Sequence, residues 1–232
     1  MPFLNDAGEV VELHLGAHGE EIGESNPENR FRVEWLDEVE RLLDEVVATP
    51  TRPLVITATG KFFSNGLDTD HIVAAPDQLP AYLDRVHAVY AKVLTLPVPT
   101  VSAVNGHAFG AGAMLALCAD HVLMRTQRGF WSLPEAALTM PFTRGMATLL
   151  RTRLTDRTAT EAMYTSRRYA ADDAVGAGIV DEAVDADRLT ARAAEIAGAR
   201  AATVGPNLAL IKRGLRAPLL DDLARPTPPG VF

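Results

Sequence analysis

The sequence predicts an α/β protein in which helices cover a largely parallel β-sheet. Along the first half of the chain, short β-rich runs alternate with helical runs in the order β-α-β-α-β-α. Such alternation requires crossover connections, which place consecutive strands parallel to one another. With 232 residues, of which 47% are hydrophobic, the chain is long enough for one ordinary globular core.

The predicted strands are β-rich runs between turn residues. Residues 10–15 alternate apolar and polar side chains, as a half-buried strand does. Residues 53–60 are apolar and bounded by proline and glycine, which predicts a buried strand. Residues 100–106 and 121–126 are predicted as the next two strands of the same sheet.

The predicted helices follow from apolar residues at helical spacing. This spacing predicts amphipathic helices over 33–48 and 79–95, and Pro97 ends the second one. A glycine-rich turn precedes an apolar helix predicted over 111–120. From 144 to 223 the chain is predicted to be mostly helical.

Two predicted loops and one interruption complete the chain. Residues 16–30 are polar and are predicted to form a loop, and the proline-rich tail after residue 223 is predicted to be extended. Residues 176–184 interrupt the helical second half. No internal repeat is visible in the sequence.

Composition excludes several classes of function. The net charge of −8 and the absence of clustered Lys and Arg argue against a nucleic-acid partner. No apolar run reaches the roughly 20 residues of a membrane span. The single cysteine, Cys118, forms no intramolecular disulfide, which suits a reducing compartment. With no secretory pattern at the start, we expect a cytoplasmic protein that does not bind a membrane. No Cys/His cluster has metal-ligand spacing, so we expect no metal.

Two glycine-containing segments, 62–68 (FFSNGLD) and 106–115 (GHAFGAGAML), carry the chemical signal. Gly106, Gly110 and Gly112 do not match a dinucleotide fingerprint, and no phosphate-binding loop is present. The simplest interpretation is that these glycines form turns and allow close packing. The alternative is an oxyanion hole, in which each segment supplies one backbone N–H to a substrate oxygen. Such a site requires no catalytic serine or cysteine.

Six motifs in order point to one family: NPENRF, ITATGKFFSNGLD, PTVSAVNGHAFGAG, LCADHVLM, LPEAALTM and AVGAGIVDEAV. Together they resemble the crotonase superfamily, the enoyl-CoA hydratase and isomerase family, and most of all its Δ3,Δ2-enoyl-CoA isomerases. The resemblance implies a crotonase-like ββα superhelix. It divides the chain into a core, 1–185, and a C-terminal helical segment, 186–232, for oligomerisation and for covering the active site. It also implies a homotrimer or a hexamer.

The resemblance assigns the site residues position by position. The backbone amides of Leu67 and Ala111 match the family's oxyanion donors, and Glu135 matches a catalytic glutamate. The residues expected to bind coenzyme A and the substrate are Ser64, Asn65, Gly66, Asp68, Thr69, Gly110, Met114 and Phe142. Phe142 lies where the chain departs from the family pattern, and we expect it to narrow the acyl pocket. From the residues alone, Asp68 also fits a turn or helix cap, and Glu135 also fits the start of a short helix.

One carboxylate stands where hydratases of the family use two. The position of the first hydratase glutamate is occupied by Met114, and only Glu135 remains. This favours an isomerase that converts 3-enoyl-CoA into 2-trans-enoyl-CoA in fatty-acid degradation. The alternatives are a hydratase-like or other acyl-CoA reaction, and a non-catalytic acyl-CoA-binding protein. Coenzyme A would be part of the substrate, so no separate cofactor is expected. Apolar neighbours, Met114, Leu138 and Phe142, are expected to raise the pKa of Glu135.

Overall fold

The structure is a computed structural model that describes residues 1–16 and 28–230. Most of the polar loop predicted over 16–30 lies outside the described residues. The strands are β1 (Phe3–Ala7), β2 (Val10–His14), β3 (Leu54–Thr57), β4 (Phe62–Ser64), β5 (Thr100–Val104), β6 (His107–Phe109), β7 (His121–Arg125), β8 (Trp131–Ser132) and β9 (Glu182–Val184). The α-helices are α1 (Val33–Ala48), α2 (Thr69–Ala74), α3 (Leu79–Leu94), α4 (Ala111–Leu117), α5 (Arg144–Arg153), α6 (Asp156–Thr165), α7 (Ala171–Gly176), α8 (Leu189–Gly198), α9 (Pro206–Leu215) and α10 (Ala217–Leu223).

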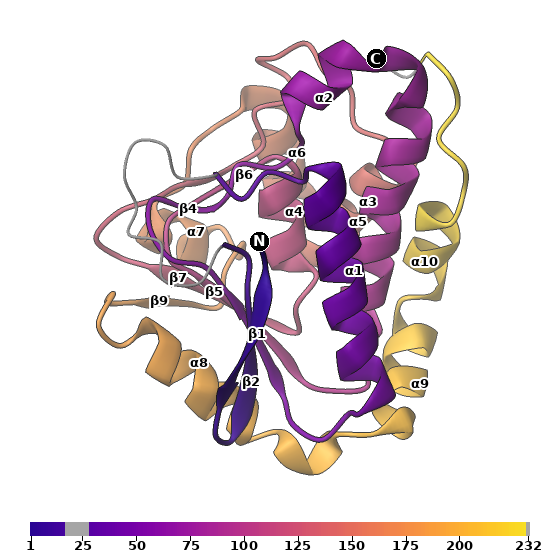
Figure 1. Cartoon of the computed structure of the whole chain (residues 1–232). Coiled ribbons are helices and arrows are strands. Elements are labelled where there is room, and N and C mark those ends of the chain that lie inside the picture. The colour runs from indigo at the N-terminus through magenta and orange to yellow at the C-terminus, as the bar shows by residue number, and fades with distance from the viewer. Residues whose placement is uncertain (17–27, 231–232) are drawn as a thin grey trace.

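The chain winds as a ββα superhelix, which confirms the predicted fold class (Figure 1). The successive units β3–β4–α3, β5–β6–α4 and β7–β8–α5 share one plan. Each unit gives its first strand to a six-stranded sheet of order β1-β2-β3-β5-β7-β9, and its second strand to a three-stranded sheet of order β4-β6-β8. All strand pairs are parallel except β1 with β2.

The short strands of the small sheet are the main difference from the prediction. Residues 53–60 and 100–106 were expected to be single strands that lead directly into glycine turns. Instead, each strand ends early, at Thr57 and Val104, and the chain bends into β4 or β6. Strands of two or three residues are too short to show a period-2 pattern. The helices predicted over 33–48 and 79–95 agree with α1 and α3 to within one residue.

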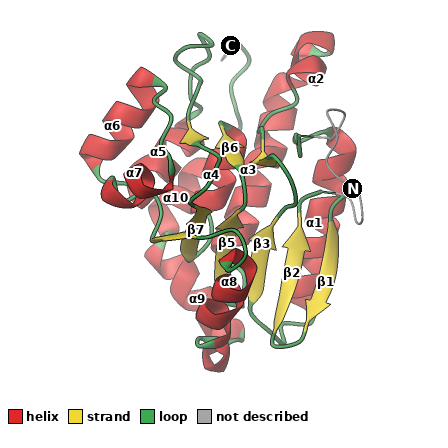
Figure 2. Ribbon diagram, turned by 90° about the vertical axis from the view of Figure 1, so that its left-hand side faces the viewer, coloured by secondary structure: helices red, strands yellow, loops and turns green. Residues whose placement is uncertain are grey.

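The large sheet is covered on both faces, as a mostly parallel sheet requires. The main core lies between this sheet, the small sheet and the helices α1, α3, α4 and α5. A second cluster packs Leu189 and Ala193 of α8 against Val55 and Val101 on the opposite face. Figure 2 shows α8 in front of the sheet, with α1 and α3 behind it.

The C-terminal segment contacts its own subunit through several helices. Leu219 and Leu223 of α10 are buried in the main core. The helices α9 and α10 lie at the right of Figure 1, along α3. The division of the chain at residue 185 remains a prediction.

Candidate active site

The candidate site lies at one edge of the small sheet. Leu67 follows β4, Ala111 follows β6, and Glu135 follows β8 along the chain. Because β4, β6 and β8 are parallel, their carboxyl ends meet at the same edge. Ligands of open parallel sheets bind at this edge, where loops from several strands converge. The superhelix therefore brings together the three residues that the sequence assigned to the chemistry.

Gly66 lies where the segment 62–68 packs against the segment 106–115. Its φ of +81° lies in the region that favours glycine. A Cβ atom at Gly66 would lie 2.7 Å from the carbonyl oxygen of Phe109 and 2.9 Å from the amide nitrogen of Ala111. The glycine is thus required both by backbone conformation and by space. Its contact with Ala111 places the following amide, that of Leu67, beside the start of α4.

The two predicted oxyanion donors are available for a ligand. Within residues 1–16 and 28–230, neither the Leu67 nor the Ala111 amide has a hydrogen-bond acceptor. Ala111 is the first residue of α4 and follows Gly110, whose φ is +51°. The first amides of a helix have no intrahelical partner and lie at the positive end of its dipole. Both amides therefore suit a substrate oxygen that develops negative charge.

The side chains of Ser64 and Asn65 stabilise the turn that follows β4 and contains Gly66. The Ser64 side chain is fully buried, its hydroxyl donates to the Asn29 carbonyl oxygen at 2.7 Å, and it accepts from the Gly66 amide at 3.1 Å. The Asn65 side chain donates to the Glu28 carboxylate at 2.5 Å. Both side chains thus have protein partners, and the contribution to coenzyme A binding expected of them remains a prediction.

Glu28 and Asn29 are supporting residues that the sequence reasoning missed. Asn29 is buried and donates to the carbonyl oxygens of Phe62 and Phe63, while the Glu28 carbonyl accepts from the Asn65 amide at 2.8 Å. Both belong to the NPENRF motif, which was assigned no role in the site. The polar composition of that motif was its only signal.

Asp68 and Thr69 lie at the rim of the site. Asp68 occupies the N-cap position of α2, but its side chain makes no capping hydrogen bond. Thr69 is exposed, and its hydroxyl accepts from Arg30 at 3.0 Å. Arg30 also pairs with Glu28 at 2.7 Å, so this rim is tied to the support of the first turn.

The Glu135 carboxyl group lies next to the segment that contains Ala111, the second predicted oxyanion donor. Glu135 begins a tight turn, and its carbonyl accepts from the amides of Leu138 and Met140. This is a turn and not the start of a short helix. A Cβ atom at Gly110 would lie 3.0 Å from Glu135 Oε1, so the carboxylate lies against Gly110, next to Ala111. Its other oxygen, Oε2, is buried and has no hydrogen-bond partner in the described part of the chain.

Burial raises the pKa of Glu135 to about 7. The desolvated carboxylate is disfavoured relative to the neutral acid, and no carboxylate among the described residues contributes to the shift. The expected direction of the pKa shift is confirmed. Of the three expected apolar neighbours, Leu138 is 55% exposed, and its contribution to the shift remains a prediction. Met114 is fully buried in α4, and Phe142 is half-buried against the main core.

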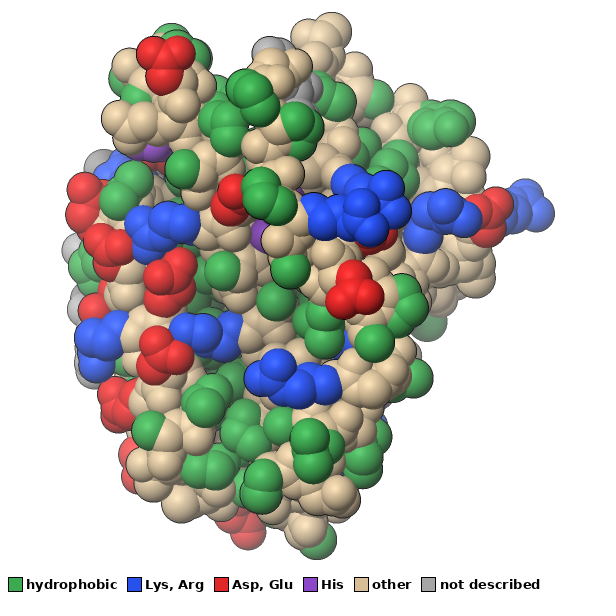
Figure 3. All heavy atoms as spheres, turned by 90° about the vertical axis from the view of Figure 1, so that its right-hand side faces the viewer, with side chains coloured by type: hydrophobic (Ala, Val, Ile, Leu, Met, Phe, Trp, Pro, Cys, Tyr) green, Lys and Arg blue, Asp and Glu red, His purple; other side chains and the backbone are tan. Residues whose placement is uncertain are grey.

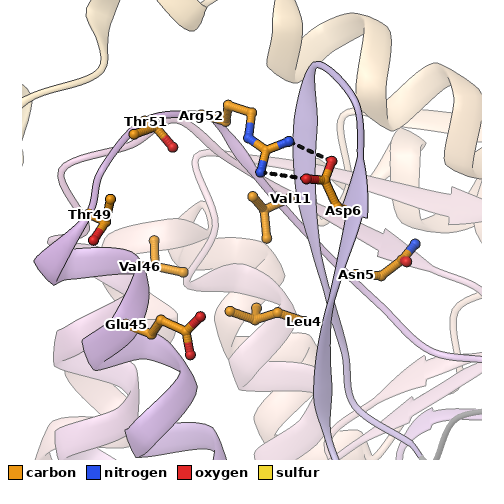
Figure 4. Close-up of a pocket in the computed structure, with 9 residues that line it drawn as sticks. All are labelled: Leu4, Asn5, Asp6, Val11, Glu45, Val46, Thr49, Thr51 and Arg52. Carbon is orange, nitrogen blue, oxygen red and sulfur yellow. Dashed lines mark hydrogen bonds and ion pairs between the residues drawn. The ribbon is translucent and has the colours of Figure 1, made fainter.

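A separate cavity of about 410 Å³ lies between β1, β2 and α1, away from these residues (Figure 4). Its Arg52 side chain is paired with Asp6, with an N–O distance of 2.6 Å. The guanidinium is thus already neutralised, and the cavity is not adjacent to the carboxylate of Glu135. In the described ranges, no group of three or more His, Cys, Asp or Glu side chains is arranged to hold a metal ion.

Sequence and structure comparisons identify the family and the fold of the chain. The profile of the enoyl-CoA hydratase/isomerase family matches residues 21–226. The peroxisomal enoyl-CoA delta isomerase 2 of Arabidopsis thaliana is 34% identical over 192 residues, which cover 79% of this chain and 77% of the relative. A carnitinyl-CoA dehydratase of Salmonella typhi is 35% identical over 149 residues, which cover 63% of this chain and 56% of the relative.

A solved structure shows the same fold. The probable enoyl-CoA hydratase of Mycobacterium tuberculosis H37Rv superposes with a TM-score of 0.84 at 22% identity, covering 96% of this chain and 91% of that one. The fold and the profile together define a crotonase-fold protein of the acyl-CoA class. The chain belongs to the enoyl-CoA hydratase/isomerase family. Among its described helices, none combines the length and the apolar character needed to cross a bilayer.

Proposed function

We propose that the protein is an enoyl-CoA isomerase that moves the double bond of a 3-enoyl-CoA to give 2-trans-enoyl-CoA. Glu135 takes a proton from C2, and the electron pair of that C–H bond delocalises onto the thioester oxygen and C4 as a dienolate. The amides of Leu67 and Ala111 stabilise the oxygen. Glu135 then returns the proton to C4, which leaves the double bond between C2 and C3 and consumes no water.

The pKa of Glu135 suits both steps of this reaction. With a pKa of about 7, the group is ionised in roughly half of the molecules at neutral pH. It is a stronger base than an exposed glutamate, and its conjugate acid readily returns the proton. Each oxyanion donor contributes about 3–4 kcal/mol to stabilisation of the dienolate-like transition state.

The observation that carries this proposal is the isolation of Glu135. Its carboxyl group lies against Gly110, no second carboxylate of the described chain shifts its pKa, and Met114 occupies the position of the other hydratase glutamate. Hydration requires a water molecule held and split by two groups, whereas double-bond migration requires one base. The isomerase name of the Arabidopsis relative points in the same direction.

Incubation with 3-hexenoyl-CoA tests the proposal directly. We expect 2-hexenoyl-CoA from the wild type and no product from Glu135→Gln, in which the amide keeps the shape of the side chain but accepts no proton. Acyl-CoA binding by the variant, measured by calorimetry, should persist. Formation of 3-hydroxyhexanoyl-CoA from 2-hexenoyl-CoA would favour a hydratase instead, and binding without turnover of either compound would favour a non-catalytic role.

The remaining site residues are proposed to bind substrate. Asp68 and Thr69 would lie along coenzyme A at the rim, and Gly110 would border the thioester. Met114 and Phe142 would face the acyl chain. Coenzyme A belongs to the substrate, so the reaction needs no further cofactor. The buried free thiol of Cys118 suits a reducing compartment, which is the basis for proposing cytoplasmic fatty-acid degradation.

The proposed assembly is a homotrimer, or a hexamer made of two trimers. On α9, Leu210, Ile211 and Leu215 are 68%, 58% and 75% exposed. Of these, Leu210 also lines a groove of about 850 Å³ between α1, α3, α9 and α10. Figure 3 shows hydrophobic side chains gathered on the lower part of the face on which α9 lies. An exposed apolar surface of this kind is typical of a protein–protein interface.

A further inference from the structure

Helix α3 carries two buried tyrosines, Tyr82 and Tyr90, whose hydroxyl groups bond to the two oxyanion segments. The Tyr82 side chain is 4% exposed and that of Tyr90 is fully buried. A buried hydroxyl needs a hydrogen-bond partner, and the interior of a helix offers none because its backbone groups are already paired. Both hydroxyl groups find their partners in the backbone of the site: Tyr90 at the first residue of α4, and Tyr82 at Asp68 and Phe31.

Tyr82 holds the first segment. Its hydroxyl accepts from the amide of Asp68 at 2.9 Å and donates to the carbonyl of Phe31, also at 2.9 Å. Asp68 directly follows Leu67, which supplies the first oxyanion amide. Phe31 forms a parallel β-bridge with Leu67, and its amide donates to the Gly66 carbonyl at 2.9 Å. The hydroxyl group therefore links the backbone at Phe31 to the backbone at Asp68, on either side of the Leu67 amide.

Tyr90 holds the second segment. Its hydroxyl donates to the carbonyl of Ala111 at 2.8 Å, and the amide of the same residue is the second oxyanion donor. Glu135 is among the charged groups that raise the pKa of Tyr90, after burial and Cys118, so the phenol also lies near the base. Phenylalanine would fill the same space, but it would leave the Ala111 carbonyl without this bond.

The two tyrosines project from one rigid element. They are eight residues apart on a helix of 16 residues, which separates their directions by roughly 80°. Both therefore lie on the same side of α3, about two turns apart along its axis. An oxyanion hole requires its donors within about 0.5 Å of the productive position. A helix that holds the backbone next to both donor amides would keep them at that spacing.

We propose that α3 sets the spacing of the two oxyanion amides, with Tyr82 as the positioning residue for Leu67 and Tyr90 as the positioning residue for Ala111. This inference rests on the proposed function, since it assigns the two amides to a thioester oxygen. Both side chains are buried, so each is assigned a role through the backbone that its hydroxyl group bonds to. Their removal therefore weakens stabilisation of the enolate more than it weakens binding of the acyl-CoA.

The test compares Tyr82→Phe, Tyr90→Phe and the double variant with Val89→Ala. Val89 is fully buried on the same helix, so its truncation destabilises α3 without removing a bond to the site. We expect kcat for 3-hexenoyl-CoA to fall by about 10- to 100-fold in each tyrosine variant, because small displacements of catalytic donors have effects of this size. KM should change by less than about twofold, since binding contacts are retained. Urea denaturation identifies any variant whose loss is due to unfolding.

A second readout separates positioning from turnover. Acetoacetyl-CoA forms an enolate with a near-ultraviolet band, and the enolate fraction of the bound ligand reports the strength of the oxyanion hole. We expect this fraction to fall in both tyrosine variants at saturating ligand and to stay at the wild-type level in Val89→Ala. Unchanged kcat and enolate fraction in folded Tyr82→Phe and Tyr90→Phe would overturn the inference. A wild-type protein that stabilises the enolate in a tyrosine-dependent manner but does not isomerise 3-hexenoyl-CoA would refute the proposed function and support the positioning role.

Discussion

Glu135 connects the reaction to pH, because a base must be ionised before it accepts a proton. With a pKa of about 7, activity should rise with pH and level off above that value. We predict that kcat/KM for 3-hexenoyl-CoA increases about tenfold per pH unit well below pH 7 and becomes constant above pH 8. A profile that stays flat from pH 5 to pH 9 would contradict the assignment of the base.

The same residue is expected to cost folding stability at high pH. Its folded-state pKa is raised, so the native state binds more protons than the unfolded state between pH 4.5 and about 7, and stability falls as pH rises through that window. Glu135→Gln removes this cost. We predict that the variant is more stable than the wild type by about 3 kcal/mol at pH 8, and that this difference shrinks toward pH 4. Urea denaturation at both pH values measures it, and a less stable variant at pH 8 would refute this prediction.

Gly66 is the residue that permits the two oxyanion segments to approach. A methyl group there would clash with the Phe109 carbonyl and the Ala111 amide, in addition to the strain of a positive φ. We predict that Gly66→Ala lowers kcat by more than about 100-fold. Gly8→Ala is the matched control, because Gly8 has a φ of +74° and a methyl group added there would have no described neighbour within 4 Å. It shares the backbone strain without the clash and should retain activity. Equal activity of the two variants would contradict the role of Gly66.

At the scale of elements, the C-terminal helix α9 is fixed to the core by a buried ionic cluster. Lys212 and Arg216 are 4% and 5% exposed, and their side chains pair with Asp120 at 2.5 Å and 3.2 Å. Burial pushes the pKa of Asp120 upward, but the nearby Lys212 ammonium and its hydrogen bond bring it below the usual value. The Asp120 carboxylate also accepts from the amide of Thr100, so one acid joins α9 to the sheet.

Removal of that acid should be costly, because two buried cations would lose their counterion. We predict that Asp120→Asn lowers the free energy of unfolding by about 3–5 kcal/mol. Asp37→Asn removes one of the two carboxylates that pair with Arg85, at N–O distances of 2.7 Å for Asp37 and 3.3 Å for Glu40, and should cost less than about 1 kcal/mol. Urea denaturation of both variants makes the comparison. Similar losses would show that the buried cluster has no special role in docking α9.

The sequence was most informative for elements with a long period. The helices α1 and α3 each span 16 residues, so their apolar stripes were visible. The strands β4, β6 and β8 were missed because they are too short to carry a pattern. In the site, the motifs pointed to Leu67, Ala111 and Glu135. They did not reveal Asn29, Tyr82 or Tyr90. These residues act through hydrogen bonds to residues far away in the sequence, and an apolar helix pattern does not show where a tyrosine hydroxyl group bonds.

At the scale of the whole molecule, the exposed apolar side chains of α9 are the basis for the proposed assembly. We predict that the wild type is a trimer or hexamer at micromolar concentration, and that Ile211→Glu and Leu215→Glu yield monomers that remain folded, because surface substitutions seldom destabilise a subunit. Tyr164→Glu, at a 77% exposed residue of α6, should leave the assembly unchanged. Light scattering measures the mass. A wild-type monomer with full isomerase activity would exclude this arrangement.

In the proposed reaction, a single base and two backbone amides move a double bond without adding water. The most direct measurement is the product formed from 3-hexenoyl-CoA in deuterated buffer, identified by mass spectrometry for the wild type and for Glu135→Gln. We expect 2-trans-hexenoyl-CoA from the wild type, with deuterium incorporated at C4 only to the extent that the proton on Glu135 exchanges with solvent. We expect no conversion by the variant. Undiminished conversion by Glu135→Gln, or a hydrated product as the first species formed by the wild type, would contradict the proposed reaction.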